Sequence, residues 1–442
     1  MTDKKDKVKK YVRTSAHTVK FANTGKLDTY HAFISEYRKV ADVYIDFIWN
    51  SKQSFVDSKG ITKTFDIEND KLDATSFFDY NSIPIPFETK LSARALSSLV
   101  TQCCGVVKAV TEKRRKLLWK RDKFIEDGKT ISPKFLELIE NVKLTKPKSE
   151  KLNPELSSKN IDFEEVNGEF NLFIRLKCLG DFEAICLPIK LHKQANKWKK
   201  ISKMKGSVLL TNRDIQIRWE FEKPIKLEGI TVGADQGITT VLSLSNKLVT
   251  KEKDSHGHSH ESIMKRLSGK RKGSKSFRKT QDHRKNFINW SINSLDLSGI
   301  RYLNLEKISN LRFGKSTSRY MSHFVYSDIE SKTQNRCEET GVQLNLQPSA
   351  FRSQRCSECG WVHYTNRNKK EFRCKCCGAA LDADINAAIN HEVELPFVPE
   401  WIMKSGLNRT SGFYWKLEGF FNLEGEELGV PLSRNEEINI LI

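Results

Sequence analysis

Helical spacing of apolar residues predicts two long helices in the first third of the chain. From Leu27 to Asn50, apolar side chains recur every three or four positions, as they do on one buried helix face. A second such face starts near Leu91, and its far end is basic. Residues 141–160 are rich in Lys, Pro and Ser and have no period, so they predict a linker.

Strand-like patterns flank this helical region. Residues 14–22 alternate roughly between apolar and polar positions, as in a half-buried strand. Further strand-like runs follow the linker at residues 170–179, 182–191, 208–210 and 215–221. We therefore expect a small β domain that is interrupted by a helical insert.

Three acidic residues lie at the ends of predicted elements in the second half. The composition changes at Gly229, where two predicted strands meet at Asp235-Gln-Gly and Asp235 ends the first of them. Residues 300–305 predict a short strand that ends in Glu306, and Asp384 stands at a predicted helix start. This order of strands, helix and acids matches an RNase H-like α/β fold.

Phosphodiester hydrolysis requires such a set of acids. Two divalent cations about 4 Å apart activate the water and stabilise the leaving oxygen, and carboxylates hold them. Oxygen ligands fit Mg²⁺ or Mn²⁺, so Asp235, Glu306 and Asp384 are the candidate catalytic and metal-binding residues. The alternatives are a plain turn at Asp235, a surface acid at Glu306, and a helix N-cap at Asp382 or Asp384.

Two cysteine pairs predict a zinc ribbon just before Asp384. Cys356 and Cys359 form one C-x-x-C knuckle, and Cys374 and Cys377 form the other. Four thiolates at this spacing suit tetrahedral, structural zinc. Two disulfides would be the alternative, and Cys376 could replace Cys377 as a ligand.

The formal net charge of +20 indicates a polyanionic partner. The segment 262–286 contains ten Lys or Arg and one acid. The start of the sequence is charged, and we find no apolar run of about 18 residues, so we expect no signal peptide, no membrane span and a cytoplasmic protein. The candidate nucleic-acid contacts are the basic side chains of two tracts: Lys265, Arg266, Lys270, Arg271, Lys272, Lys275, Arg278 and Lys279, with Lys113, Arg114, Arg115 and Lys116.

Four segments of the chain carry a resemblance to a known family: Gly233–Gly237, Leu303–Ile308, Ser353–Gly360 with Cys374–Gly378, and Asp384–Ala388. They resemble the three split RuvC motifs and the zinc ribbon of TnpB, a transposon-encoded RNA-guided nuclease. Miniature type V CRISPR effectors share this pattern. The resemblance covers about residues 10 to 390 and rests on motifs only from Gly229 onward.

The resemblance implies a division of the chain into five parts. An N-terminal, β-barrel-like wedge domain would be interrupted by a helical recognition domain, and a RuvC-like nuclease domain would contain the zinc ribbon. The expected boundaries are 1–26 and 141–228 for the wedge, 27–140 for the helical domain, 229–350 and 381–395 for the nuclease, 351–380 for the ribbon, and 396–442 for a tail. The tail could pack on the core, contact a second subunit, or be disordered.

The resemblance also implies partners and chemistry. Base pairing with a guide RNA would select double-stranded target DNA beside a short adjacent motif, and one RuvC site with Mg²⁺ or Mn²⁺ would cleave it. One structural Zn²⁺ would stabilise the ribbon, and a monomer or a homodimer would assemble on one guide RNA. A prokaryotic or phage-encoded origin follows, with the guide taken from a CRISPR array or a transposon end.

Two departures from the family pattern and three alternatives remain. Gln236 stands where the family usually has an aliphatic residue, and Arg352 replaces a common Thr.

The alternative functions are a nuclease-inactive repressor with a guide RNA, a guide-free zinc-ribbon DNA-binding protein, and a guide-free junction resolvase. The first would require a broken set of acids, and this chain has all three.

Overall fold

The chain divides into two compact units, and each is described by itself: the first is Lys10–Glu222, and the second comprises Met1–Lys9 and Lys223–Ile442. The computed structural model describes residues 9–56, 62–66, 71–72, 78–126, 128, 131–308 and 318–429. Residues 1–8 and 430–442, predicted as the start of the wedge and the end of the tail, lie outside the described residues. Within the described part, no helix combines the length and the hydropathy that a membrane span requires.

Long amphipathic helices carry much of the core of the first unit. Its helices are α1 (Thr24–Asn50), α2 (Ala93–Glu126), α3 (Pro133–Glu140) and α4 (Lys193–Ile201), with 3₁₀ turns at Tyr80–Ser82, Ser149–Lys151 and Ser158–Asn160. α1 begins after Asn23, whose side chain accepts a hydrogen bond from the backbone N of Lys26 at 3.0 Å. This N-cap satisfies one of the free N–H groups of the first turn. The two long helices predicted from apolar spacing are confirmed.

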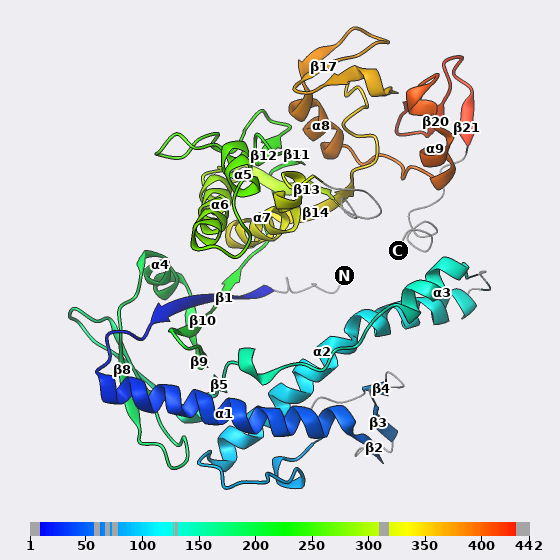
Figure 1. Cartoon of the computed structure of the whole chain (residues 1–442). Helices are drawn as coiled ribbons and strands as arrows, with labels where there is room; N and C mark the ends of the chain where they lie inside the picture. The colour runs from blue at the N-terminus through cyan, green and yellow to red at the C-terminus, as the bar shows by residue number, and fades with distance from the viewer. Residues whose placement is uncertain are drawn as a thin grey trace, which may run out of the picture. The chain divides into compact units, whose positions relative to one another are not determined.

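The strands of the first unit form three sheets (Figure 1). One has the order β1-β10-β9-β5 and consists of β1 (Lys9–Thr18), β10 (Asp214–Lys223), β9 (Lys203–Leu210) and β5 (Glu155–Leu156). The others are β6 (Ile161–Glu165), β7 (Leu172–Leu176) and β8 (Ile185–Ile189), and β2 (Lys52–Val56), β3 (Thr62–Asp66) and β4 (Lys71–Leu72). β1, which precedes the helices, neighbours β10, which follows them, so segments on both sides of the helices share one sheet. The interrupted, β-barrel-like wedge domain stays a prediction.

One correction concerns the segment 141–160, which was predicted as a linker. β5 lies inside this segment and pairs with β9, and Leu156 is buried. A two-residue strand among Lys, Pro and Ser is too short to produce a period in the sequence.

A four-stranded sheet of order β12-β11-β13-β14 forms the centre of the second unit. Its strands are β11 (Ile230–Gln236), β12 (Leu242–Leu244), β13 (Ile300–Lys307) and β14 (Gln343–Pro348), with helices α5 (His260–Ser268), α6 (Lys275–Asn293) and α7 (Tyr326–Thr340) and a 3₁₀ turn at Met321–His323. β11 runs antiparallel to β12 and parallel to β13, and β13 runs parallel to β14. The basic segment 262–286 falls on α5, α6 and the loop between them.

The two faces of this sheet have different covers. Ala234 and Leu305 lie in a hydrophobic core that also contains side chains of α5, α6 and α7. Gly233 lies on the opposite face against α8 (Ala383–Glu392), where an added Cβ would be 1.9 Å from the backbone O of Ala388. Because side chains alternate along a strand, Asp235 shares the α8 face with Gly233.

The ribbon and the tail follow the sheet. Their elements are β15 (Trp361–Val362), β16 (Arg367–Asn368), β17 (Glu371–Arg373), β18 (Ala380–Asp382), α9 (Glu400–Ser405), β19 (Phe413–Trp415), β20 (Phe420–Phe421) and β21 (Glu427–Gly429), with 3₁₀ turns at Tyr364–Asn366 and Leu407–Arg409. β19 of the tail pairs with β15 of the ribbon, and β20 and β21 extend that sheet. The described part of the tail therefore packs on the ribbon.

Candidate metal centres

Asp235 and Glu306 lie side by side at the ends of two parallel strands. β11 and β13 pair in register up to Ala234 and Leu305, so these acids come next on each strand. Both side chains point to the α8 face, because their predecessors face the core. Asp235 is only 7% exposed. The two acids, each predicted at the end of a strand, thus lie at the ends of neighbouring strands.

Burial and proximity raise the pKa of both carboxyls. The pKa of Asp235 lies well above its usual value because the group is buried, and because Glu306 and Asp384 place negative charge nearby. Burial is also the main cause that raises the pKa of Glu306 to about 7. Two carboxylates this close repel each other unless a proton or a cation separates them. The pair is therefore suited to bind a cation.

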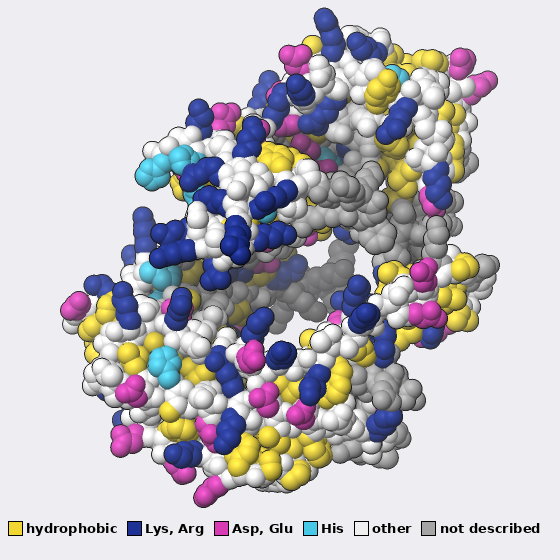
Figure 2. Space-filling view, in the orientation of Figure 1, with side chains coloured by type: hydrophobic (Ala, Val, Ile, Leu, Met, Phe, Trp, Pro, Cys, Tyr) yellow, Lys and Arg dark blue, Asp and Glu magenta, His cyan; other side chains and the backbone are white. Residues whose placement is uncertain are grey.

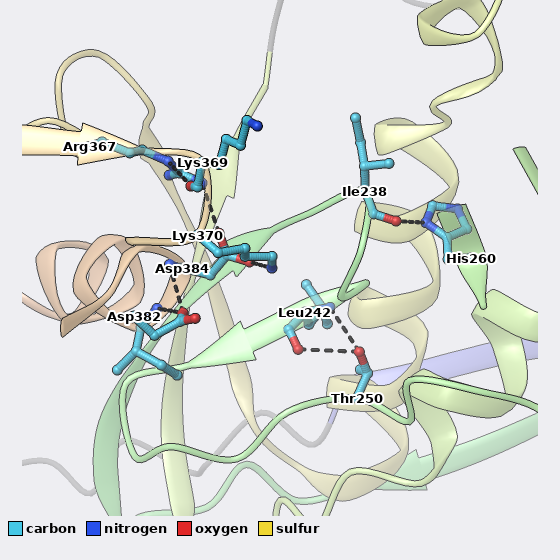
Figure 3. Close-up of polar contacts among 10 residues, drawn as sticks. Ile238, Leu242, Thr250, His260, Arg367, Lys369, Lys370, Asp382 and Asp384 are labelled. Atoms are coloured by element: carbon cyan, nitrogen blue, oxygen red, sulfur yellow. Dashed lines mark hydrogen bonds and ion pairs between the residues drawn. The ribbon is translucent and has the colours of Figure 1, made fainter. Parts of the chain in front are cut away.

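Asp384 lies at the start of α8 but is turned toward two basic side chains (Figure 3). Nη2 of Arg367 is 2.8 Å from its Oδ1, and Nζ of Lys370 contacts its Oδ2. Both cations come from the ribbon, and Asp384 itself is 4% exposed. Asp382 is the N-cap of α8, because its Oδ1 accepts from the backbone N of Asp384 at 2.9 Å and of Ile385 at 3.1 Å.

His391 joins the acid pair, although the sequence reasoning did not include it. Asp235, Glu306 and His391 each offer one ligand atom, and these three atoms all lie within 4.8 Å of one another. A cation with bonds of about 2.1 Å places two ligands at most about 4.2 Å apart, so small side-chain rotations suffice for coordination. The available signal was its position seven residues after Asp384, two turns later on the same helix face.

The departures at Gln236 and Arg352 have structural roles. Nε2 of Gln236 donates to the backbone O of Glu306 at 2.8 Å, which connects the ends of the two acid-bearing strands. Arg352 is buried and donates from Nε to the backbone O of Pro348 at 3.0 Å and from Nη1 to that of Val393 at 3.1 Å. It therefore connects the end of β14 to the segment that follows α8.

Gly237 and the start of α8 approach each other closely. An added Cβ at Gly237 would be 2.5 Å from the backbone O of Thr240 and 3.6 Å from Oδ2 of Asp384. A side chain at this position would thus collide with the turn after β11. The same distances place Asp384 beside the strand end that carries Asp235.

The four predicted cysteine ligands form one cluster. The sulfur atoms of Cys356, Cys359, Cys374 and Cys377 all lie within 4.8 Å of one another. Sγ of Cys356 is 3.7 Å from that of Cys377, and Sγ of Cys359 is 3.6 Å from that of Cys374. Four sulfurs at 2.3 Å from a tetrahedral zinc ion would be about 3.8 Å apart, so the cluster fits zinc. All ten cysteines, each in the described part of the chain, are free thiols rather than disulfides.

The backbone at each knuckle has the conformation that the motif needs. Gly360 and Gly378 follow the second cysteine of their pairs with φ of 82° and 78°, a region that glycine enters without strain. Cys376 lies outside the cluster, and its Sγ is 2.9 Å from the hydroxyl of Tyr414. Of the two alternatives left open by the sequence, the geometry thus brings Cys377 rather than Cys376 to the other sulfurs.

The predicted nucleic-acid contacts are mainly surface residues. Seven of the eight predicted residues between Lys265 and Lys279 are exposed, and the eighth, Lys270, is half-buried and donates to Oγ1 of Thr280 at 2.5 Å. In α2, Lys113 is exposed, whereas Arg115 and Lys116 lie 3.7 Å and 3.5 Å from Glu112. Figure 2 shows Lys and Arg side chains widely spread over the visible surface. The α5–α6 tract therefore offers the denser positive surface.

Comparisons with known proteins agree with the motifs. Residues 326–391 match a family model described as the Cas12f1-like TNB domain. A CRISPR-associated endodeoxyribonuclease Cas12f1 of Sulfoacidibacillus thermotolerans is 29% identical over 150 residues, which are 34% of this chain and 34% of the relative. A TnpB-like protein of Aquifex aeolicus (strain VF5) is 30% identical over 92 residues, which are 19% of this chain and 30% of the relative. The matches thus span about a third of these relatives.

A solved structure shares the fold over nearly the whole chain. The C2c1 protein of Alicyclobacillus acidoterrestris, determined in complex with a single-guide RNA, superposes with a TM-score of 0.51 and 8% sequence identity. The match covers 97% of this chain and 95% of the C2c1 chain. Together with the sequence matches, this confirms the predicted resemblance to TnpB and the miniature type V effectors. The individual roles of the acids, the cysteines and the basic residues stay predictions.

Proposed function

We propose that this chain, a relative of the TnpB-like and miniature type V effectors, is an RNA-guided DNA endonuclease. The observation that carries the proposal is the pairing of buried Asp235 with half-buried Glu306 at adjacent strand ends, with Asp384 beside them. Acids in this arrangement can hold divalent cations, which supply a nucleophilic water and stabilise the leaving oxygen. Relatives named as endodeoxyribonucleases support the same activity.

The residues around the acids perform the other tasks of the reaction. Asp235 and Glu306 would hold the cation between two strands that Gln236 joins, so their spacing is fixed before substrate arrives. The turn at Gly237, which has no side chain, would let a phosphate approach the acids closely. Asp384 would complete the metal site once it exchanges Arg367 and Lys370 for a cation.

The rest of the chain would bind nucleic acid. The exposed basic residues of α5, α6 and their connecting loop would contact the phosphates of guide RNA or of the RNA–DNA heteroduplex. The first unit would serve as wedge and recognition domains and read a short motif beside the target. The cysteine cluster would hold one structural Zn²⁺, because four thiolates leave no open position for substrate. One or two copies would assemble on each guide RNA.

The test separates a guided nuclease from a guide-free one. Zinc-containing protein that has been depleted of RNA is incubated with Mg²⁺ and duplex DNA, with and without the RNA that co-purifies with it. We expect no site-specific cutting until that RNA is added, and we expect the cut to move when the guide segment is changed. Site-specific cutting without RNA would favour a resolvase, and guided binding without any cutting would favour a repressor.

The basic tract provides a second arm of this experiment. Gln substitutions at Arg271, Lys272 and Lys275 together should weaken RNA-dependent cleavage of all targets about equally, since phosphate contacts carry no sequence information. The charge-matched control carries Gln substitutions at three exposed residues of the same unit, Lys247, Lys251 and Lys253. If both triple variants lose RNA-dependent cleavage to the same extent, the tract has no specific role.

A further inference from the structure

His391 is a buried imidazole with an unused nitrogen. Its side chain, at the end of α8, is 1% exposed, and its Nδ1 has no hydrogen-bond partner. An unpaired buried polar atom costs stability, so such an atom needs a reason to be there. The reason lies next to it, because its ring approaches the carboxyl oxygens of Asp235 and Glu306 within 4.8 Å.

The imidazole of His391 faces two carboxyl groups, and its Nδ1 has no other partner among the described residues. A protonated histidine would form an ion pair with the acids, whereas a neutral one offers a lone pair to a cation. Asp384, in contrast, already contacts Arg367 and Lys370. The ligand atoms that converge in this structure are therefore two carboxylates and one imidazole.

We propose that His391 is a nitrogen ligand of the cation held by Asp235 and Glu306, and that it makes this position prefer a first-row transition cation such as Mn²⁺ over Mg²⁺. The inference rests on the proposed function, because the cation is the one that the nuclease would use. Mg²⁺ is a hard ion that favours oxygen ligands, and imidazole nitrogen favours transition metals. The metal preference of the site would thus be set by a residue outside the predicted acids.

The test detects the metal–nitrogen bond directly. Full-length, zinc-loaded, RNA-free protein receives Mn²⁺, and pulsed electron paramagnetic resonance records coupling to a directly bound nitrogen. Mn²⁺ serves as the probe because the thiolate cluster prefers softer metals. We expect nitrogen coupling in the wild type and its loss in His391→Leu and His391→Gln. Mn²⁺ affinity should fall at least about tenfold in His391→Leu, and Mg²⁺ affinity should change much less.

Two further variants, together with His391→Gln, make the outcome decisive. Asp235→Asn should abolish Mn²⁺ binding, which shows that the signal comes from this site. His17→Leu removes another buried histidine with an unpartnered Nδ1, in the first unit, and should leave the coupling unchanged. His391→Gln keeps a polar side chain that reaches the acids, so it serves if His391→Leu does not fold.

Two results would overturn the inference. One is site-bound Mn²⁺ without nitrogen coupling in the wild type, and the other is coupling that persists in both folded His391 variants. Failure of the proposed function would look different: nitrogen coupling would be present, but no DNA would be cleaved with either metal and the guide RNA.

Discussion

The cysteine cluster and the acid cluster reach different degrees of completeness within the same unit. All four sulfurs converge at distances that fit a tetrahedral ion. Among the predicted acids, only Asp235 and Glu306 converge, and Asp384 contacts two cations instead. The four sulfurs can fill all positions around an ion, whereas Asp384 is held by Arg367 and Lys370. These two side chains must release Asp384 before all three acids can bind the same cations.

The difference follows from how each cluster is assembled. Each cysteine knuckle forms within one tight turn, so its sulfur pair is nearly fixed by four consecutive residues. The acids of the other cluster lie on β11, β13 and α8, which are far apart in the sequence. Their packing places the negative charges of Asp235 and Asp384 in the protein interior. Local motifs therefore fix a structural metal site, while a catalytic site depends on packing and on the charges that surround it.

The largest expected effect distinguishes the chemistry of the two clusters. Asp235→Asn or Glu306→Gln should each lower guided DNA cleavage at least about a hundredfold, because several kcal/mol of metal-based stabilisation is lost. Guide-dependent DNA binding should persist. Cleavage rates with Mg²⁺ and binding by gel shift measure the two quantities.

Asp296→Asn is the matched control for these variants, since it removes an acid that accepts from the backbone N of Ser298 at 2.9 Å, a role that Asn can also fill. Its cleavage rate should stay within about threefold of the wild type. Wild-type cleavage by Glu306→Gln would refute the assignment of the acid cluster.

The second effect concerns stability. Cys356→Ser should lower the zinc content and lower the free energy of unfolding by about 3 kcal/mol or more, because metal-binding energy in such a site is folding energy. Cys376→Ser removes a neighbouring thiol that lies outside the cluster and should keep one zinc per chain. Metal analysis and thermal unfolding measure both. Equal zinc loss in the two variants would mean that Cys376 is a ligand after all.

How far the sequence predicts this fold depends on the length of each pattern. The long helices α1 and α2 and the strands β11 and β13 were predicted within a few residues, because their apolar spacing extends over several turns or pleats. β5 was missed because two residues carry no period. The pairing of β19 with the ribbon was also beyond the sequence, since pairing between distant strands leaves no local signal.

The candidate site shows the same limit. The acids and the cysteines could be named from their motifs and from their places at element ends. The position of His391 beside two of the acids requires the packing of α8 on Gly233, and the ion pairs of Asp384 require the ribbon to fold over the helix start. Both are tertiary facts that single-sequence patterns do not carry.

A third prediction uses the pH dependence of the acid cluster. The folded pKa of Glu306, about 7, lies above its unfolded value, so the folded state binds more protons between about pH 4.5 and 7. Without Mg²⁺ or Mn²⁺, the free energy of unfolding should therefore fall on the order of 2 kcal/mol as pH rises from 5 to 8. Chemical denaturation of the zinc-loaded protein at several pH values measures it.

The Glu306→Gln variant has no ionisable group at this position, so its free energy of unfolding should change less over this pH range. Added Mn²⁺ should restore the free energy of unfolding that the wild type loses at pH 8. Parallel pH profiles of wild type and Glu306→Gln would show that the carboxyl is not held in its neutral form.

The smallest effect tests why the acid cluster is less complete than the cysteine cluster. If Arg367 and Lys370 compete with a cation for Asp384, then Arg367→Gln and Lys370→Gln should each raise the affinity of the RNA-free protein for Mn²⁺. The expected gain is no more than about fivefold, because both basic side chains are partly exposed and such pairs contribute about 1 kcal/mol or less. Arg373→Gln removes an exposed charge from the same ribbon and is the control for the change in net charge. An equal gain in all three variants would reduce the effect to general electrostatics, and no gain would mean that the ion pairs persist beside a bound cation.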